Sequence, residues 1–485
     1  MDICGYLKIK EEFPMAKSVK LDANGYRKFG FIDKLAYAAG DFGCNMSFAL
    51  KSYLTIFWTQ YMGIDSIVMA SLLLLVQVWD AINDPVIGAL IDNDKKTTYK
   101  RGKFLAYIWL GSVGLMFAGA ACFLPFKGAP AMVKNILFVA GYIIWDAFYT
   151  IANVPYGSML SLISADAGER AELSTWRSVG SMVGGMGCSM LIPMLVYDAN
   201  NELKGDVIFW MALLMGFLGF LAFQFMIRNT VIRVNTDMQV GEDAPKFNLV
   251  KACTNFLRNR AAVGATLAPV GTFIGMYGAS TASTIMFQAY FKNAQISGLL
   301  SMASYFGLFL WMPFIGKLAA KFGKKEVITT GLLWSFACYV VALFVPMPAN
   351  NTGVIMWAVL QLLVALGAGI GSCLGWSMMA DAMDWEEYKF GNRNEGTTYA
   401  LHSFFRKLAQ GVGPSLGLVV ATWMGYDANL GANQPAEIAA KMKTLVIVMY
   451  LVAYAMQLVG YGLIFPMNKK KTAEVQAELA ARKAK

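Results

Sequence analysis

The chain has 485 residues, of which 57% are hydrophobic and only 15% are charged. This composition excludes an ordinary soluble protein, which needs far more polar surface to face water. The net charge of +10 would suit nucleic acid, but its distribution among the predicted loops indicates membrane topology instead, so nucleic acid is not an expected partner.

Apolar runs of about 20 residues, each long enough to cross a bilayer as a helix, recur along almost the whole chain. We predict twelve spans, at residues 35–61, 67–91, 104–124, 134–162, 179–196, 208–227, 262–290, 299–320, 327–345, 354–383, 398–424 and 444–467. The sequence therefore predicts an all-α membrane protein, with twelve transmembrane helices in two six-helix bundles around a central cavity.

The predicted organisation is a cytoplasmic N-terminal segment (1–34), a first bundle (35–228), a cytoplasmic middle loop (229–261), a second bundle (262–467) and a cytoplasmic tail (468–485). Lysine and arginine gather in the loop after the second span, in the middle loop and in the tail, whereas the opposite loops hold only single or paired lysines. This positive-inside pattern predicts that both termini are cytoplasmic. The seven cysteines form no CxxC or His-Cys group, so neither a disulfide framework nor a zinc site is predicted.

The first span carries Asp41 and Asn45, which share a helical face because they are four residues apart. Lys51 lies nearer the outer end of this span. We expect its long side chain to reach the membrane interface.

The second span carries the strongest local signal, the segment WDAINDP at 79–85. Asp80 and Asp84 lie one helical turn apart on the same face, with the Asn83 amide alongside. A charge at the centre of a bilayer costs about 2.5–3.5 kcal/mol even on lenient insertion scales, so such groups persist where they pair, face water or bind an ion. We predict a site for a monovalent cation here. The alternative is a structural charge pair that locks two helices.

On the fourth span, one polar stripe runs through Asp146, Thr150, Asn153 and Gly157. Helix rise puts Asp146 about 18 Å from Lys134, near the middle of the membrane. We interpret the stripe as the lining of a transport pathway. The alternative is that it satisfies its polar groups against a neighbouring helix.

The tenth span ends in a charged cluster at its predicted cytoplasmic mouth. The cluster consists of Asp381, Asp384, Glu387, Arg393 and Glu395. We interpret it as a gate of ion pairs rather than a binding site. The chain has no GxxxxGK[ST] motif, so ATP is not expected as the direct energy source.

The eleventh span carries Lys407, the predicted counter-charge of the paired carboxylates in the second span. Ser403 shares its face, whereas His402 and Arg406 lie on the adjacent face. His402 is either a proton carrier or, as is commoner for a lone histidine on a helix, part of hydrogen-bonded packing. Arg406 either binds a substrate carboxylate or pairs structurally with Asp146.

Several motifs follow one another in the order and spacing of a known family. They are GDFGxN at 40–45, WDAINDP at 79–85, YTxxNxPY at 149–156, ADxxDxxEY at 380–388 and FxxK at 404–407. Together they resemble the glycoside–pentoside–hexuronide:cation symporters of the major facilitator superfamily, to which melibiose permease belongs. The resemblance runs from Asp33 to Pro466 and implies the major facilitator architecture.

The resemblance also implies roles for individual residues. It implies a cation site formed by Asp80, Asn83, Asp84 and Thr150. The sugar-facing positions that it implies are Asn45, Asn153, Arg177 and Lys407. We add as further substrate-binding candidates Asp41, Ser403, His402 and Arg406. Asn45 and Asn153 stand where the melibiose branch has aspartates, so the chain resembles the xyloside and glucuronide branch more closely.

The leading hypothesis is a secondary active transporter that imports a sugar (a glycoside, pentoside or hexuronide) with a cation by alternating access. The expected partners are the sugar, a monovalent cation and the lipid bilayer. The coupling ion is H⁺ or Na⁺, with H⁺ favoured because Asn153 replaces an acid, and no other cofactor or metal is expected. We expect a functional monomer in the cytoplasmic (inner) cell membrane of a bacterium.

Two other functions stay open at this point. One is a carrier of lysolipids or other small molecules from the same superfamily. The other is a membrane-embedded enzyme acting on lipid-linked sugars, for which the sequence shows no metal or nucleotide signature and no sizeable extramembrane loop.

Overall fold

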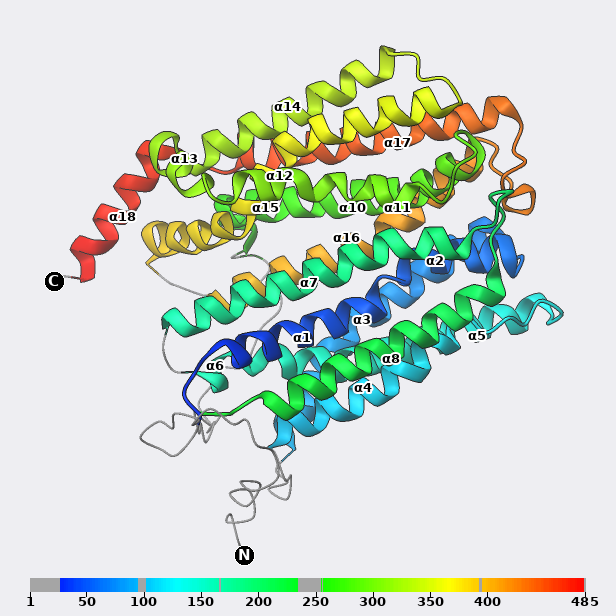
Figure 1. The fold of residues 1–485 in the computed structure, drawn as a ribbon. Coiled ribbons are helices and arrows are strands. Elements are labelled where there is room, and N and C mark those ends of the chain that lie inside the picture. Colours follow the sequence, from blue (N-terminus) through cyan, green and yellow to red (C-terminus); the bar gives the residue numbers. More distant parts are fainter. Residues whose placement is uncertain are drawn as a thin grey trace, which may run out of the picture.

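The computed structural model describes residues 27–94, 102–164, 167–233, 254, 256–391 and 395–483, and these are almost entirely helical (Figure 1). The first half contains α1 (Phe31–Phe48), α2 (Lys51–Ile56), α3 (Ser66–Asn93), α4 (Lys103–Ala121), α5 (Ala131–Ser158), α6 (Leu160–Ile163), α7 (Ala167–Val196) and α8 (Gly205–Asn229). The second half contains α10 (Arg260–Ala289), α11 (Ser297–Ser301), α12 (Ala303–Trp311), α13 (Ile315–Phe322), α14 (Lys324–Phe344), α15 (Asn351–Phe390), α16 (Glu395–Trp423), α17 (Ala436–Gln457) and α18 (Lys469–Lys483). Short π-helical segments continue α2 over Phe57–Tyr61 and α17 over Leu458–Ile464.

Eight of the described helices are long and apolar enough to cross a membrane, and a bent helix pair, Ser297–Trp311 with Ile315–Phe322, would make nine. The prediction of an all-α membrane protein is therefore confirmed, whereas the count of twelve spans stays a prediction. The predicted spans 67–91 and 398–424 correspond to α3 and α16, which are helical but carry ionisable side chains in their middle. Those charges lower the apolar character by which a span is recognised.

The helices form two groups that lie side by side along the length of the molecule (Figure 1). In the first half, α1 packs against α7 and α8, α4 packs against α5 and α8, and α3 packs against α5. In the second half, α10 packs against α16 and α17, and α15 packs against α12 and α14. The halves meet where α3 contacts α16 and where α7 contacts α11. The exact limits of the predicted bundles stay predictions, and most of the middle loop lies outside the described residues.

Glycine permits both contacts between the halves. A Cβ atom on Gly411 of α16 would overlap the side chain of Gln77 on α3, and one on Gly298 of α11 would overlap the carbonyl oxygen of Ser189 on α7. Small residues allow helix backbones to approach closely within a membrane. The close approach of α16 to α3 positions the site described below.

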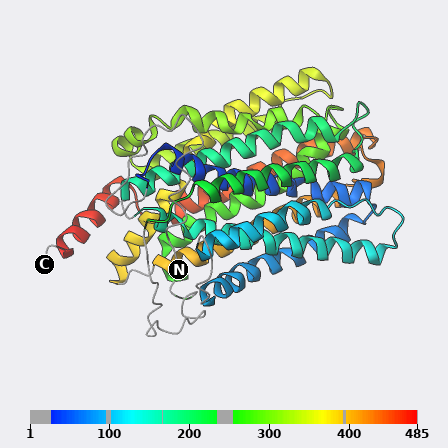
Figure 2. The same ribbon diagram turned by 60° about the horizontal axis from the view of Figure 1, so that its bottom comes forward.

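Hydrogen bonds join the two halves at the end of the bundle away from α18, the end at which α2 and α11 lie in Figure 1. The side-chain amides of Gln60 and Gln288 bond reciprocally, with Nε2-to-Oε1 distances of 2.8 and 3.0 Å. Gln60 also donates to the hydroxyl of Tyr426 at 2.8 Å, and Asn201 donates to the carbonyl oxygen of Lys292 at 2.9 Å. We call Gln60, Gln288, Tyr426 and Asn201 the far-end clasp. At the opposite end, α18 projects away from the bundle (Figure 2).

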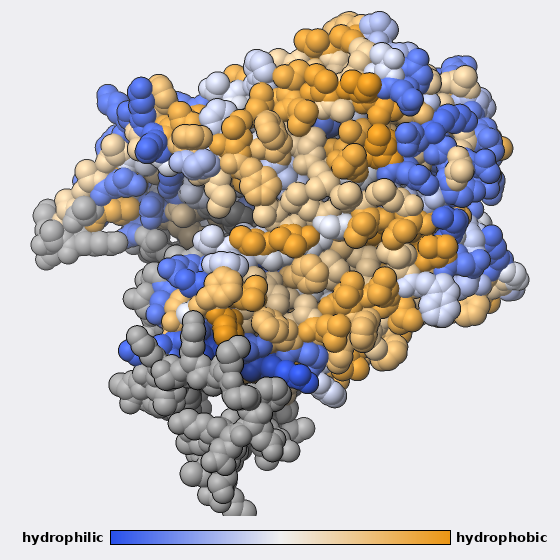
Figure 3. Space-filling model, viewed as in Figure 1, coloured by the Kyte–Doolittle hydropathy of each residue, from blue (hydrophilic) through white to orange (hydrophobic). Residues whose placement is uncertain are grey.

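Apolar residues cover the middle of the visible face of the molecule (Figure 3). Large apolar side chains are exposed on the outer helices, including Trp210, Phe344 and Trp423, of which Phe344 is 81% exposed. Polar residues gather at the two ends of the visible face (Figure 3). An exposed apolar surface of this extent is stable in contact with lipid chains rather than water.

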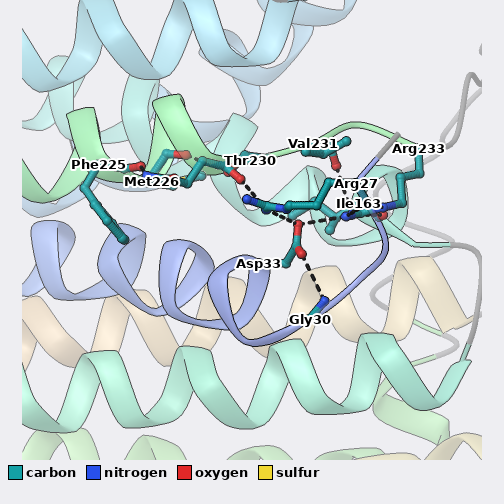
Figure 4. A network of polar contacts seen from close by, with 10 residues as sticks. Arg27, Gly30, Asp33, Ile163, Phe225, Met226, Thr230, Val231 and Arg233 are labelled. Atoms are coloured by element: carbon teal, nitrogen blue, oxygen red, sulfur yellow. Dashed lines mark hydrogen bonds and ion pairs between the residues drawn. The ribbon is translucent and has the colours of Figure 1, made fainter. Parts of the chain in front are cut away.

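A buried carboxylate ties the start of α1 to the segment after α8 (Figure 4). Asp33 is only 1% exposed and its Oδ1 accepts hydrogen bonds from Arg27 at 2.8 Å and from Arg233 at 3.0 Å. Its Oδ2 accepts from the backbone amide of Gly30 at 3.0 Å, which satisfies one of the open donors at the start of the helix. Arg27 also donates to the carbonyl oxygen of Asn229 at 2.9 Å.

We predict that Asp33→Asn lowers the free energy of unfolding by about 3 kcal/mol, because it leaves two partly buried guanidinium groups without their shared anion. Thermal unfolding of the purified protein in detergent measures the change. The matched control is Lys34→Gln, which removes an ion pair with the half-exposed Glu172 and should cost no more than about 1 kcal/mol. Equal destabilisation by the two changes would contradict this account of Asp33.

Candidate functional site

Asp80 lies where α3 meets α16, and lysines from both halves of the molecule contact it. Lys407 Nζ on α16 lies 3.7 Å from Asp80 Oδ1, and Lys51 Nζ on α2 lies 3.9 Å from Asp80 Oδ2. Gln77, one turn earlier on α3, donates to Oδ2 at 2.8 Å. The predicted contact between Lys407 and Asp80 is present. Asp84 follows one turn later on α3, but its side chain lies outside the described part of the chain.

The polar stripe of α5 faces this part of α3. Asn83 Nδ2 donates to Asp146 Oδ2 at 2.9 Å and to Thr150 Oγ1 at 3.1 Å, and all three side chains are buried. Asp146 is also close enough to Asp80 for their carboxyl groups to interact. Two carboxylates at close range repel when both are ionised, and a proton or a cation between them relieves the repulsion.

These residues form the candidate cation site, which we define as Asp80, Asn83, Asp146 and Thr150. It offers carboxylate, amide and hydroxyl oxygens, the ligands that hard cations prefer. Three of its members were proposed from sequence, whereas Asp146 was predicted to line a pathway or to pair with Arg406. In the structure, the Asp146 carboxylate accepts a hydrogen bond from the amide of Asn83. Among the described residues, no group of three or more His, Cys, Asp or Glu side chains could hold a metal ion.

Lys51 does not reach the interface, which corrects the expectation from sequence. Its ammonium lies over the rings of Phe48, Tyr142 and Trp145, at 5.3, 5.2 and 5.8 Å from their centroids. The position of Lys51 in the sequence could have predicted that its side chain stays inside the membrane. It lies ten residues before the predicted end of its span at residue 61, and ten residues of helix rise by about 15 Å, more than a lysine side chain can cover.

The predicted sugar-facing residues of the first half lie together on α1, α5 and α7. Arg177 Nε lies 3.1 Å from Asp41 Oδ1, and its guanidinium lies 4.9 Å from the centroid of the Tyr156 ring. Asn45 Nδ2 donates to the hydroxyl of Ser181 at 3.0 Å. Asn153 Oδ1 accepts from the Cys44 thiol at 3.7 Å.

This group of residues borders the other half of the molecule. A Cβ atom built on Gly185 would lie 3.2 Å from the hydroxyl of Tyr305, which belongs to α12, and 3.9 Å from Asn45 Oδ1. The polar groups of α1 and α7 therefore face the second half, where a bound solute could touch both halves. Arg177 remains 39% exposed although it is paired with Asp41.

The adjacent face of α16 borders a separate cavity within the second half. It measures about 190 Å³ and is lined by residues of α10, α15, α16 and α17, including His402 and Arg406. His402 Nδ1 is hydrogen-bonded to the hydroxyl of Thr266 at 2.9 Å, and the Arg406 guanidinium lies 5.5 Å from the centroid of the Phe273 ring. Ser403 is half-buried on the same helix.

Two alternatives from the sequence can be compared with these contacts. Asp146 accepts a hydrogen bond from Asn83, and the Arg406 guanidinium lies over the Phe273 ring, so the contacts recorded for the two residues are with other partners, and their pairing stays a prediction. The hydrogen bond to Thr266 favours packing as the role of His402.

The predicted gate is only partly described. Lys324 of α14 donates to both carboxylate oxygens of Asp381 at 2.6 and 2.9 Å, so this pair lies within the second half. Asp384 and Glu387 follow on α15, whereas Arg393 and the side chain of Glu395 lie outside the described residues. The predicted tail forms α18, whose Arg482 donates to the carbonyl oxygen of Tyr388 at the end of α15. The role of the cluster as a gate stays a prediction.

Comparisons with known proteins agree with this architecture. Residues 36–469 match the family described as MFS/sugar transport protein. The chain is 28% identical over 458 residues to YjmB of Bacillus subtilis, named an uncharacterized symporter, with 93% of this chain and 96% of that protein covered. It is 24% identical over 454 residues to the glucuronide carrier protein homolog of Escherichia coli, with 93% and 95% covered. A solved D-xylose–proton symporter shares the fold at a TM-score of 0.58 and 14% identity, covering 90% of this chain and 98% of that one.

We predict that Asn83→Ala lowers the free energy of unfolding by about 2 kcal/mol, because it removes the amide that satisfies the buried Asp146 and Thr150. Asn153→Ala is the matched control, since the recorded side-chain partner of Asn153 is a weak thiol donor at 3.7 Å. Thermal unfolding in detergent compares the two variants. A larger loss for Asn153→Ala would contradict the role given to Asn83.

Proposed function

The chain belongs to the MFS/sugar transport protein family of multi-pass membrane transporters, and we propose that it moves a sugar together with a monovalent cation by alternating access. The protein is a transporter and not an enzyme, since its family and relatives are symporters and carriers. The observation that carries the proposal is the position of Asp80, a membrane carboxylate held between lysines from the two halves.

The ion pair between Asp80 and Lys407 crosses from one half of the molecule to the other. When a cation binds beside Asp80, it competes with the Lys407 ammonium for the same carboxylate, and the contact between α3 and α16 weakens. Binding of the cation is thereby coupled to the relative position of the halves, as alternating access requires. Either H⁺ or Na⁺ can act in this way, and the oxygens of Asn83 and Thr150 suit Na⁺ as additional ligands.

A sugar is the proposed substrate because the residues on the neighbouring helices offer hydrogen-bond donors and acceptors that match hydroxyl groups. Asp41, Asn45, Asn153 and Arg177 lie on three helices of the first half. A planar guanidinium binds either paired hydroxyls or a carboxylate, so we propose a glycoside, pentoside or hexuronide. A lysolipid carrier would require a more apolar surface than these residues provide.

The far-end clasp supports a proposed orientation. It joins the halves at the end away from α18, so solute access in this conformation is from the end that bears α18. We propose that this end is cytoplasmic, as the basic loops predict, that the protein resides in the cytoplasmic cell membrane, and that it works as a monomer in the direction of import.

We predict that Asp80→Asn abolishes sugar accumulation driven by a cation gradient, while some exchange down a sugar gradient continues. Uptake of a panel of labelled glycosides, pentosides and hexuronides into membrane vesicles, with imposed H⁺ or Na⁺ gradients, measures this. Asp206→Asn is the control, because Asp206 pairs with the Tyr61 hydroxyl at the far end. Full accumulation by Asp80→Asn would refute the proposed coupling, and stimulation by Na⁺ at fixed pH without alkalinisation would identify Na⁺ over H⁺.

We also predict that Lys407→Ala reduces gradient-driven uptake by at least about tenfold, the effect of losing one interaction of ~1.4 kcal/mol in the rate-limiting state. Arg406→Ala should reduce uptake less, because Arg406 lies in the separate cavity of the second half. The same vesicle assay, normalised to the amount of protein in the membrane, compares the variants. Normal accumulation by Lys407→Ala would show that the exchange of partners at Asp80 is wrong.

A further inference from the structure

The two lysines at Asp80 differ in the half of the molecule to which they belong. Lys407 is on α16 in the second half, whereas Lys51 is on α2 in the same half as α3 and α5. A movement that separates the halves can carry Lys407 away from Asp80. The same movement, as a displacement of one half against the other, leaves Lys51 beside Asp80, because both residues belong to the first half.

Lys51 is also fixed in place by its surroundings. Three aromatic rings surround its ammonium at 5.2 to 5.8 Å, which is the range of a cation–π contact. Trp145 is itself held by a hydrogen bond from its Nε1 to the hydroxyl of Ser47 at 2.7 Å. Lys51 is 16% exposed and close enough to interact with both Asp80 and Asp146.

Asp80 and Asp146 are the described carboxylates of the site, and Lys51 and Lys407 are the ammonium groups beside them. A free cation that binds beside Asp80 therefore competes with an ammonium group for the same carboxylate. Because Lys51 stays with Asp80, the charge that leaves is that of Lys407.

A small cavity lies next to Lys51 between the halves. It measures about 40 Å³ and is lined by Lys51 and Thr55 of α2 together with Tyr277, Ser280 and Gln410 of the second half. This is enough room for a water molecule. An ion that approaches Asp80 from this side therefore meets the Lys51 ammonium.

We propose that Lys51 is a permanent, covalently attached cation of the candidate cation site, which weakens the binding of the free coupling ion and so sets its affinity. The proposal rests on the proposed cation coupling. Lys51 acts through the charge of the site and is a positioning residue rather than a ligand of the cation.

The experiment measures binding of Na⁺ and Li⁺ to the purified full-length protein by titration calorimetry at fixed pH. Lys51→Gln should bind Na⁺ at least about tenfold more tightly than the wild type, because it removes a positive charge a few ångströms from the site. Lys51→Arg keeps the charge and the aromatic contacts, so it should bind as the wild type does. Lys134→Gln is the control, a lysine of α5 that donates to the carbonyl oxygen of Met62.

The pair Lys51→Gln and Lys51→Arg separates charge from packing. Lys51→Gln should bind Na⁺ more tightly than Lys51→Arg, because only Lys51→Gln removes the positive charge. A purely structural role for Lys51 would lower the melting temperature of both variants and leave their Na⁺ affinities equal. If Lys51→Gln does not fold, Lys51→Met takes its place in the same Na⁺ titration. Methionine puts an uncharged side chain of similar length among the rings of Phe48, Tyr142 and Trp145.

Equal Na⁺ affinity in the wild type and in a folded Lys51→Gln or Lys51→Met protein would overturn the proposal. Vesicle uptake tests the proposed function separately. If sugar uptake by the wild type does not depend on any imposed cation gradient, coupled transport is refuted. Even then, tighter Na⁺ binding in Lys51→Gln would support the inference about Lys51, and unchanged binding would refute it.

Discussion

A carboxylate within a membrane needs a compensating charge, and the arrangement around Asp80 follows from that need. Removal of one partner of a buried ion pair costs about 3–5 kcal/mol, because the remaining charge is left uncompensated in a medium of low dielectric constant. Lys407 can compensate Asp80 only if α16 lies close to α3, and Gly411 on α16 permits that approach by leaving room for Gln77. Gln77 in turn donates to Asp80. Helix packing between the halves and charge compensation therefore support each other.

Part of this site could be predicted from the sequence because it depends on spacing within single helices. Asp80 and Asn83 lie three residues apart on α3, and Asp146 and Thr150 lie four apart on α5, so helical geometry alone aligns each pair. The partner of Asp80 could also be predicted, since Lys407 is a cation in the middle of an apolar run. The same apolar runs predicted the all-α membrane fold. The count of twelve spans stays a prediction, because α3 and α16 owe their polar character to these same residues.

The remaining contacts depend on how helices that are distant in sequence rotate against each other, which spacing does not determine. Spacing alone would allow Asp146 to contact either Arg406 or Asn83, and in the structure it accepts a hydrogen bond from Asn83. Arg406 instead borders a cavity within the second half. The cage around Lys51 combines Phe48 with Tyr142 and Trp145, which lie more than 90 residues away in the chain, and no local pattern links them. The pairing of Asp381 with Lys324 likewise joins two helices across a long separation.

The far-end clasp differs from the Asp80 site in that its recorded side-chain contacts are between neutral groups. The amides of Gln60 and Gln288 and the hydroxyl of Tyr426 carry no net charge, and they do not titrate in the physiological pH range. Dissolved salt screens charges, but it has little influence on a reciprocal pair of amides. The hydrogen bonds of the clasp are therefore insensitive to the ionic strength and acidity of the solution that bathes them. A protein whose surroundings change in salinity or pH would keep these contacts between its halves at that end.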